Sequence, residues 1–193
     1  GWPHEEAWVW LRLKLLADAG LVGLPNAGKS TFINAVTNAQ AKVGAYAFTT
    51  TRPQLGVVRH HQREFVVADI PGLIEGASAG AGLGHEFLRH IERTKILLHV
   101  VDAASVEGRD PVEDVRAIMD ELSAYNPELC TLPQAIAANK LDAYYSEDGK
   151  DPLEELKKEF EPKGIPVFGI SAVSGKGVEE LLHYLFEVLK TVD

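Results

Sequence analysis

The chain carries the stretch Gly23-Leu24-Pro25-Asn26-Ala27-Gly28-Lys29-Ser30, which fits the pattern Gly-x-x-x-x-Gly-Lys-[Ser/Thr] of a phosphate-binding P-loop. The apolar residues from Leu16 to Leu24 predict a strand before it, and Thr31 to Val36 predict the first turns of a helix after it. The motif therefore has the strand, loop and helix setting that phosphate binding requires. An incidental glycine-rich turn is the alternative, and a chance match in a chain of this length occurs about once in a hundred.

Each part of this motif has a physical role toward a phosphate chain. Gly23 and Gly28 let the backbone turn tightly and approach the phosphates, whose negative charge meets N–H groups at the positive end of the helix. Lys29 is placed to reach the β- and γ-phosphates, and the Ser30 hydroxyl is a ligand of the kind that Mg²⁺ prefers. We expect nucleotide contacts from the whole motif and the residue after it: Gly23, Leu24, Pro25, Asn26, Ala27, Gly28, Lys29, Ser30 and Thr31.

Composition limits the class of protein. With 193 residues, 46% of them hydrophobic, the chain is long enough for one well-buried domain. The formal charge of −9 argues against nucleic-acid binding through the whole surface, although a local basic patch is compatible with it. Cys130 is the lone cysteine, which excludes an internal disulfide and a cysteine-based zinc site, and we expect an inert buried thiol. A single cysteine suits a reducing cytosol, so we expect a cytoplasmic protein. No apolar run reaches the roughly 18 residues of a membrane span, so we expect no membrane contact. We also expect a monomer.

Apolar runs of strand length alternate with segments of helical periodicity along the rest of the chain. We expect strands at 55–58, 65–68, 96–101, 135–138 and 167–170, and helices at 86–93, 112–122, 153–160 and 178–189. The short segment from Arg59 to Glu64 predicts a hairpin turn. The expected fold is α/β: a P-loop NTPase fold with a mainly parallel six-stranded sheet, one antiparallel edge strand and helices on both faces.

Three further motifs follow predicted strand ends, where ligands bind in sheets of this kind. The first is Asp69-Ile70-Pro71-Gly72, in which Asp69 can hold Mg²⁺ through water and the N–H of Gly72 can meet a γ-phosphate. By itself, Asp-x-Pro-Gly is a common turn. Its place after an apolar strand and downstream of the P-loop is what favours the phosphate-binding interpretation.

The second and third motifs indicate the base. A carboxylate at Asp142 can accept from both the N1–H and the 2-amino group of guanine, whereas adenine offers neither donor. A site built in this way rejects the wrong base by roughly 10⁴ or more. We expect Lys140 to lie along the base, and a backbone N–H of the Ser171-Ala172 turn to meet the guanine O6. The expected base contacts are Asn139, Lys140, Leu141, Asp142, Ser171, Ala172 and Val173.

Together these motifs resemble the Obg family of bacterial GTPases that act in large-subunit assembly. The resemblance runs from about Leu11 to Lys190, and it is carried by residues 69–77 and 82–94 and by Phe48-Thr49-Thr50. Ala47 and Thr51 depart from the family pattern, in which proline and leucine are usual. The resemblance assigns residues 16–193 to the GTP-binding domain and residues 1–15 to the remainder of a missing upstream domain or linker, so we expect the chain to be an excised piece.

The resemblance also implies site residues that spacing alone does not give. Mg²⁺ would be bound by Ser30, Thr50 and Asp69, although spacing alone does not choose Thr50 over its neighbours Thr49 and Thr51. The implied catalytic residues are Asn26, Lys29, Thr50 and Gly72. Nucleotide contacts are expected in addition from Phe48, Thr49, Thr50, Thr51, Arg52, Asp69, Ile70, Pro71 and Gly72.

These observations predict a GTPase switch whose affinity for the large ribosomal subunit or its assembly intermediates changes on hydrolysis. The alternative is a sensing module for GTP, GDP or ppGpp that regulates a partner without turnover. A third reading, the cytosolic domain of a membrane-bound GTPase, is disfavoured because residues 69–77 differ from that pattern.

Two features bear on the rate of hydrolysis. Leu73 stands where Ras-like proteins have the glutamine that orients the attacking water, which predicts slow intrinsic turnover. Asn26 resembles the P-loop asparagine with which potassium-activated GTPases bind K⁺. The alternative, that Asn26 only stabilises the turn, stays open.

Histidines offer no further catalytic site. His85, Glu86 and His90 do not form a zinc motif, because the second histidine lies about 140° around a helix from the first. His60 and His61 fall in the predicted turn, and His99 in an apolar strand is expected to be a satisfied core residue.

Overall fold

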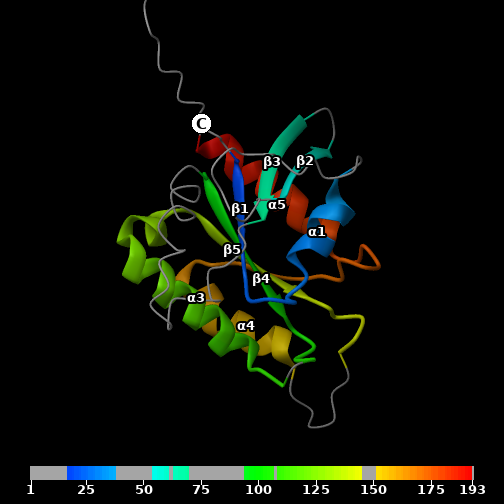
Figure 1. The fold of residues 1–193 in the computed structure, drawn as a ribbon, viewed down its shortest axis with the longest axis vertical. Helices are drawn as coiled ribbons and strands as arrows, with labels where there is room; N and C mark the ends of the chain where they lie inside the picture. The colour runs from blue at the N-terminus through cyan, green and yellow to red at the C-terminus, as the bar shows by residue number, and fades with distance from the viewer. Residues whose placement is uncertain are drawn as a thin grey trace, which may run out of the picture.

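The computed structural model describes residues 17–37, 54–60, 63–69, 94–106, 108–144 and 151–192. Within them, six strands form one sheet in the order β2-β3-β1-β4-β5-β6 (Figure 1). The strands are β1 (Ala19–Val22), β2 (Gln54–His60), β3 (Arg63–Asp69), β4 (Ile96–Asp102), β5 (Gln134–Asn139) and β6 (Val167–Gly169). All neighbours are parallel except β2, which pairs antiparallel with β3 at the edge. The predicted mainly parallel sheet with one antiparallel edge strand is confirmed.

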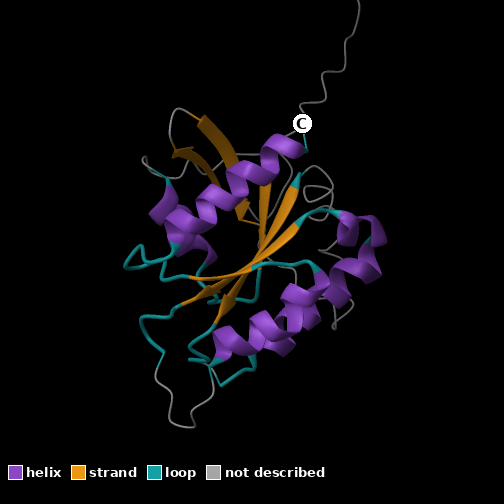
Figure 2. Ribbon diagram, turned by 180° about the vertical axis from the view of Figure 1, so that it is seen from behind, coloured by secondary structure: helices purple, strands orange, loops and turns teal. Residues whose placement is uncertain are grey.

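Helices cover both faces of this sheet, as expected (Figure 2). In the described segments they are α1 (Lys29–Val36), α3 (Pro111–Tyr125), α4 (Pro152–Phe160) and α5 (Val178–Thr191), with short 3₁₀ helices at Pro127–Thr131 and Glu161–Lys163. Helices α1 and α5 pack on one face, where Phe65 of β3 meets Phe186 of α5 with ring centroids 4.8 Å apart. Helices α3 and α4 pack on the other face, through residues such as Ile118 and Leu156.

The centre of the sheet is β4, whose seven residues are all buried. A strand covered by helices on both faces reads as a continuous apolar run rather than an alternating one, and this explains why the segment from Ile96 was recognisable. Its register places Leu98 beside Leu21 of β1 and Ala135 of β5. The carboxyl ends of β1, β4 and β5 therefore meet at one edge, where the site lies.

The helices begin in two different ways. Asp110 caps α3 by accepting a hydrogen bond from the N–H of Val112 at 2.8 Å, and Pro111 occupies the first turn, where its missing N–H costs nothing. Helix α1 has no side-chain cap and instead follows Gly28, whose φ is 98°. Its first N–H groups are therefore left for a ligand, as the P-loop motif predicts.

The structure contradicts two sequence predictions and leaves others outside the described residues. The predicted hairpin is confirmed by the antiparallel β2–β3 pairing, but the bounds given for its turn, Arg59 to Glu64, are too wide: the ladder continues to the pair His60 and Arg63, and Arg59 Nε lies 3.1 Å from Glu64 Oε2 across it. Cys130 is exposed in the 3₁₀ helix after α3, not buried. The predicted helix at 86–93, residues 1–15 and His61 lie outside the described residues. Among the described helices, none has the length and apolar character needed to cross a membrane.

Candidate nucleotide-binding site

The P-loop lies between β1 and α1 and approaches the neighbouring strand closely. A Cβ on Gly23 would stand 2.3 Å from the carbonyl oxygen of Val100, so only glycine fits there without displacing β4. The loop then turns between Leu24 and Ala27, whose N–H donates to the Leu24 carbonyl at 3.3 Å, with Asn26 in the left-handed region at φ 63°. The chain thus forms the compact loop that the glycine spacing predicted.

Asn139 connects the P-loop to the predicted base-binding loops. Its side chain is buried, donates from Nδ2 to the Ala27 carbonyl at 3.0 Å, and accepts at Oδ1 from the N–H of Ala172 at 3.0 Å. Gly28 makes this approach possible, because a Cβ there would lie 2.3 Å from Asn139 Nδ2. One amide therefore joins three motifs that are far apart in the sequence.

Lys29 lies within the loop that precedes it. Its Nζ donates to the carbonyl oxygens of Gly23 at 2.7 Å and of Leu24 at 3.1 Å. The ammonium group is therefore held at the inner side of the P-loop. A lysine in this position carries its positive charge to the place where phosphate oxygens are expected.

Ser30 and Asp69 meet beside the loop. The Ser30 hydroxyl donates to Asp69 Oδ2 at 3.1 Å, and Asp69 is only 7% exposed at the end of β3. Burial raises the pKa of Asp69, while the charge of Lys29 and the Ser30 hydrogen bond oppose that rise. Among the described residues Oδ1 of Asp69 has no hydrogen-bond partner. A buried, unsatisfied carboxylate oxygen beside a hydroxyl is a donor set that suits Mg²⁺.

The residues predicted to bind the base follow β5 and β6. Lys140 adopts a left-handed conformation, with φ 67°, and its Nζ forms an ion pair with Asp102 Oδ2 at 2.7 Å. Asp142 is exposed, so its carboxylate is accessible for the predicted contact with a base. The N–H of Ser174 donates to the Ser171 hydroxyl at 3.0 Å, which orders the turn around Ala172.

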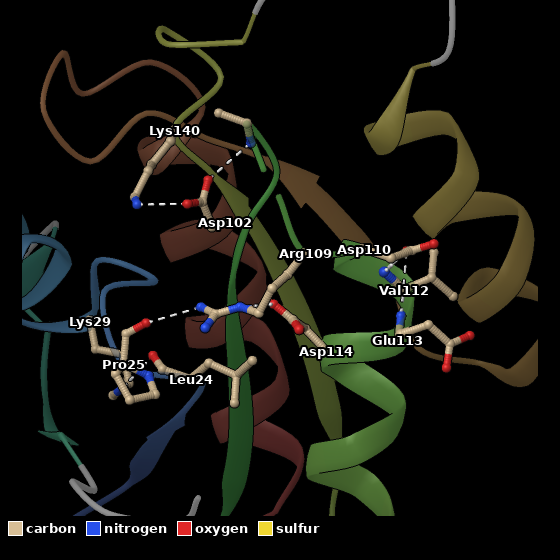
Figure 3. A network of polar contacts seen from close by, with 11 residues as sticks. Leu24, Pro25, Lys29, Asp102, Arg109, Asp110, Val112, Glu113, Asp114 and Lys140 are labelled. Atoms are coloured by element: carbon tan, nitrogen blue, oxygen red, sulfur yellow. Dashed lines mark hydrogen bonds and ion pairs between the residues drawn. The ribbon is translucent and has the colours of Figure 1, made fainter. Parts of the chain in front are cut away.

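Two residues at this site were not recognised from the sequence. Figure 3 shows that Asp102 accepts a hydrogen bond from Lys140, and that Arg109 donates a hydrogen bond to the carbonyl oxygen of Pro25 in the P-loop. Asp102 also accepts from the N–H of Ala104 at 3.1 Å, so it holds both its own loop and Lys140. The available signal for Asp102 was a carboxylate closing the apolar run of β4. No local pattern marks Arg109.

The remaining predicted contacts fall outside the described residues. These are Phe48, Thr49, Thr50, Thr51, Arg52, Ile70, Pro71 and Gly72, together with Leu73. Thr50 as a metal ligand and Gly72 as a phosphate contact therefore stay predictions. Within the described part, the structure brings the P-loop, Asp69, Asn139 to Asp142 and the Ser171 turn to one edge of the sheet.

Comparison with known proteins identifies the family. Residues 18–140 match the family described as 50S ribosome-binding GTPase. The chain belongs to this family. The resemblance to Obg proteins is confirmed by GTPase Obg of Lachnoclostridium phytofermentans, which is 60% identical over 194 residues and covers 100% of this chain and 45% of that protein. GTPase Obg of Sphingopyxis alaskensis is 60% identical over 190 residues, or 98% of this chain and 53% of that protein. The chain thus spans about half the length of these curated relatives.

Solved structures bear out the fold. The G domain of the T. maritima FeoB iron transporter matches with a TM-score of 0.66 at 23% identity, covering 90% of this chain and 99% of that chain. The cytosolic domain of L. pneumophila FeoB matches with a TM-score of 0.65 at 23% identity, covering 87% of this chain and 68% of that chain. At these identities the likeness concerns the fold alone, and it agrees with the predicted P-loop NTPase architecture.

Proposed function

We propose that this chain is the guanine-nucleotide switch of a cytoplasmic protein that binds GTP with Mg²⁺, hydrolyses GTP to GDP and phosphate, and acts in assembly of the large ribosomal subunit. The observation that carries the proposal is the Asn139 connection. It joins the P-loop to the Asn-Lys-x-Asp motif and the Ser171 turn through two hydrogen bonds of 3.0 Å. A phosphate site and a base site held by one buried amide support binding of one nucleotide across both.

At the phosphate end, Lys29 exchanges its bonds to the Gly23 and Leu24 carbonyls for bonds to the β- and γ-phosphates. Ser30 and Asp69, which are in hydrogen-bond contact, would hold Mg²⁺, with Thr50 as the further ligand implied by the resemblance. When bound, Mg²⁺ offsets the negative charge that builds on the phosphates. The N–H groups that begin α1 add preorganised donors, which need no reorganisation as charge develops.

At the base end, the exposed carboxylate of Asp142 accepts from N1–H and the 2-amino group of guanine. Lys140 keeps its position along the base because Asp102 holds its ammonium group at 2.7 Å. These contacts select GTP over ATP, since an adenine would leave the Asp142 carboxylate without a donor.

Intrinsic hydrolysis is slow in this proposal. Leu73 has no group that can orient the attacking water, so turnover of this domain alone is on the order of 10⁻⁴ to 10⁻³ s⁻¹. Asn26 would hold K⁺ through its side-chain carbonyl oxygen, and the ion would supply positive charge beside the triphosphate. The alternative that Asn26 serves the turn has support of its own, since Asn26 occupies the left-handed position of that turn.

The ribosomal role is supported by the description of the family as 50S ribosome-binding GTPase. We propose ppGpp as a second guanine ligand for the same site. The competing function is a sensing module that binds guanine nucleotides without turnover. Single-turnover hydrolysis of GTP at saturating protein separates the two. Release of phosphate within hours supports the switch. If bound GTP instead stays intact over that time, the result supports the sensing module. Nucleotide-dependent co-sedimentation of the full-length protein with large ribosomal subunits tests the partner.

A further inference from the structure

Arg109 bridges helix α3 and the P-loop, although it belongs to neither nucleotide-binding motif. Its Nη2 donates to the carbonyl oxygen of Pro25 at 3.3 Å, and its Nε lies 3.4 Å from Asp114 Oδ2 (Figure 3). The Asp114 side chain is 12% exposed and that of Arg109 is 37% exposed. The carboxylate thus fixes one end of a half-buried guanidinium, and the other end reaches the P-loop.

The carbonyl that Arg109 contacts belongs to the central peptide of the Leu24–Ala27 turn. In that turn the N–H of Ala27 donates to the Leu24 carbonyl, and the third residue, Asn26, has φ 63°. Proline cannot adopt positive φ, so a turn with Pro25 second and a positive φ third is of type II. Types I and II differ by a flip of this central peptide, and Arg109 binds the carbonyl of that same peptide.

The orientation of this peptide decides where the next N–H points. The chain has no cis peptide bond among the described residues, and in a planar trans peptide the C=O and N–H point to opposite sides. With the Pro25 carbonyl directed to Arg109, the N–H of Asn26 is directed away from Arg109. A P-loop binds phosphate through backbone N–H groups, so a flip of this peptide would reverse the direction of one such donor.

Hydrogen bonds order the first turn of α3, which carries the Asp114 carboxylate that contacts Arg109. Asp110 caps α3 through Val112, and the N–H of Asp114 donates to the Asp110 carbonyl at 3.0 Å. The first turn of α3 is therefore fixed by its own cap, and it fixes the carboxylate that holds Arg109. Burial raises the pKa of Asp114 and the charge of Arg109 opposes that rise, which is consistent with a pair formed in a partly dry position.

We propose that Arg109 is a positioning residue that holds the Pro25–Asn26 peptide in the orientation in which the Asn26 N–H faces the β-phosphate of a bound nucleotide. This inference rests on the nucleotide-binding function proposed above. Arg109 does not touch the nucleotide; it acts through the backbone. Its removal therefore affects nucleotides that carry a β-phosphate and spares those that lack one.

The test compares the binding of GDP and of GMP to the wild type and to four variants. Arg109→Gln removes the cation, Asp114→Asn removes its anchor, and Arg109→Lys keeps a charge with a single donor group. The matched control is Arg116→Gln, because Arg116 is an arginine of the adjoining helix α3 that pairs with Glu113 and Glu159 at 2.6 and 2.8 Å instead of with Asp114. Affinities come from displacement of a fluorescent GDP, and urea unfolding checks that each variant is folded.

We expect Arg109→Gln to lower the affinity for GDP about tenfold, the order expected for one hydrogen bond from a charged donor. The affinity for GMP should not change. Asp114→Asn should act in the same direction, Arg109→Lys should be intermediate, and the Arg116 variant should match the wild type. Equal loss for GDP and GMP, or unchanged GDP affinity in folded Arg109→Gln, would overturn the proposal. A wild type that binds neither nucleotide would instead overturn the proposed function.

Discussion

His99 should make the stability of the fold depend on pH. It lies in the middle of β4 with no exposed surface, and its Nε2 is 2.8 Å from Gln134 Oε1. The amide of Gln134 is oriented by its other end, since Nε2 donates to the Cys130 carbonyl at 3.3 Å. The Gln134 oxygen therefore faces His99, and the neutral ring carries its proton on Nε2. Nδ1 has no hydrogen-bond partner in the described part of the chain.

Protonation of His99 would place a charged Nδ1–H in this apolar position without an acceptor. Burial lowers the pKa of His99 from 6.5 to about 4, and the hydrogen bond to Gln134 opposes that shift only in part. The folded chain therefore excludes a proton that the unfolded chain takes up below pH 6.5. Stability is full above that pH and is lost as the pH falls from 6.5 toward 4. A difference of about 2.5 pKa units corresponds to about 3 kcal/mol, a large share of a typical 5 to 15 kcal/mol.

Urea unfolding of the wild type and of His99→Gln between about pH 7.5 and pH 4 measures this effect. Carboxylates also titrate in this range, so the informative quantity is the difference in unfolding free energy between the two proteins at each pH. We expect the wild type to lose about 3 kcal/mol relative to the variant over the range. The control is His183→Gln, because His183 is exposed on α5. A wild-type minus His99→Gln difference that does not change with pH would refute the reasoning.

Three further predictions concern the nucleotide. Asp142→Asn should shift preference from GTP to XTP, because the amide offers a donor to the xanthine O2; equal GTP affinity in the variant, measured by competition, would show that Asp142 does not read the base. Gly28→Ala should lower the free energy of unfolding by about 1 to 2 kcal/mol, because Gly28 has φ 98° and alanine is strained there. The new Cβ should also displace Asn139 and so weaken GDP binding. An unchanged urea midpoint and an unchanged GDP affinity would contradict this prediction. Replacing KCl by NaCl at constant ionic strength should slow GTP hydrolysis, and Asn26→Ala should abolish the difference; a potassium response that survives in the variant would exclude Asn26 as the ligand.

The sheet was predictable because its signals are local. The run from Ile96 to Val101 is apolar except for His99, and every residue of β4 is buried, which is the pattern of a strand covered on both faces. The P-loop, Asp69 and Asn139 were predictable because each motif directly follows a strand, so the fold class implied their common edge. The hydrogen-bond partners of these residues are not predictable from the motifs.

The failures have physical reasons. Arg59 and Glu64 are polar and suggested a turn, yet an edge strand exposes such side chains and pairs them across the ladder, where they are 70% and 63% exposed. Cys130 was expected in the core from its residue type, but the 3₁₀ helix that contains it buries only Leu129. The exposure of Cys130 depends on how this short helix packs against the domain, and residue type alone does not predict that packing.

Asp102 and Arg109 show which functional residues a motif search misses. Both act on the site from the connection between β4 and α3, one by holding Lys140 and the other by holding the Pro25 carbonyl. Their partners lie 38 and 84 residues away in the sequence, so no spacing rule links them. Such residues are found only once the fold places their loops side by side.

These contacts also bear on how the loops of the proposed nucleotide site are preorganised. Asn139 holds the P-loop to the Ser171 turn, and Asp102 holds Lys140 beside it. Each contact is made between groups of the protein itself, so the conformational entropy of ordering these loops is lost on folding rather than on binding. Because Asn139 contacts both loops, replacing it should weaken phosphate and base recognition together, whereas replacing Asp142 should affect the base alone. Measured affinities of Asn139→Ala and Asp142→Ala for GDP and for inorganic pyrophosphate would reveal this, since pyrophosphate has no base and only the Asn139 variant should lose it.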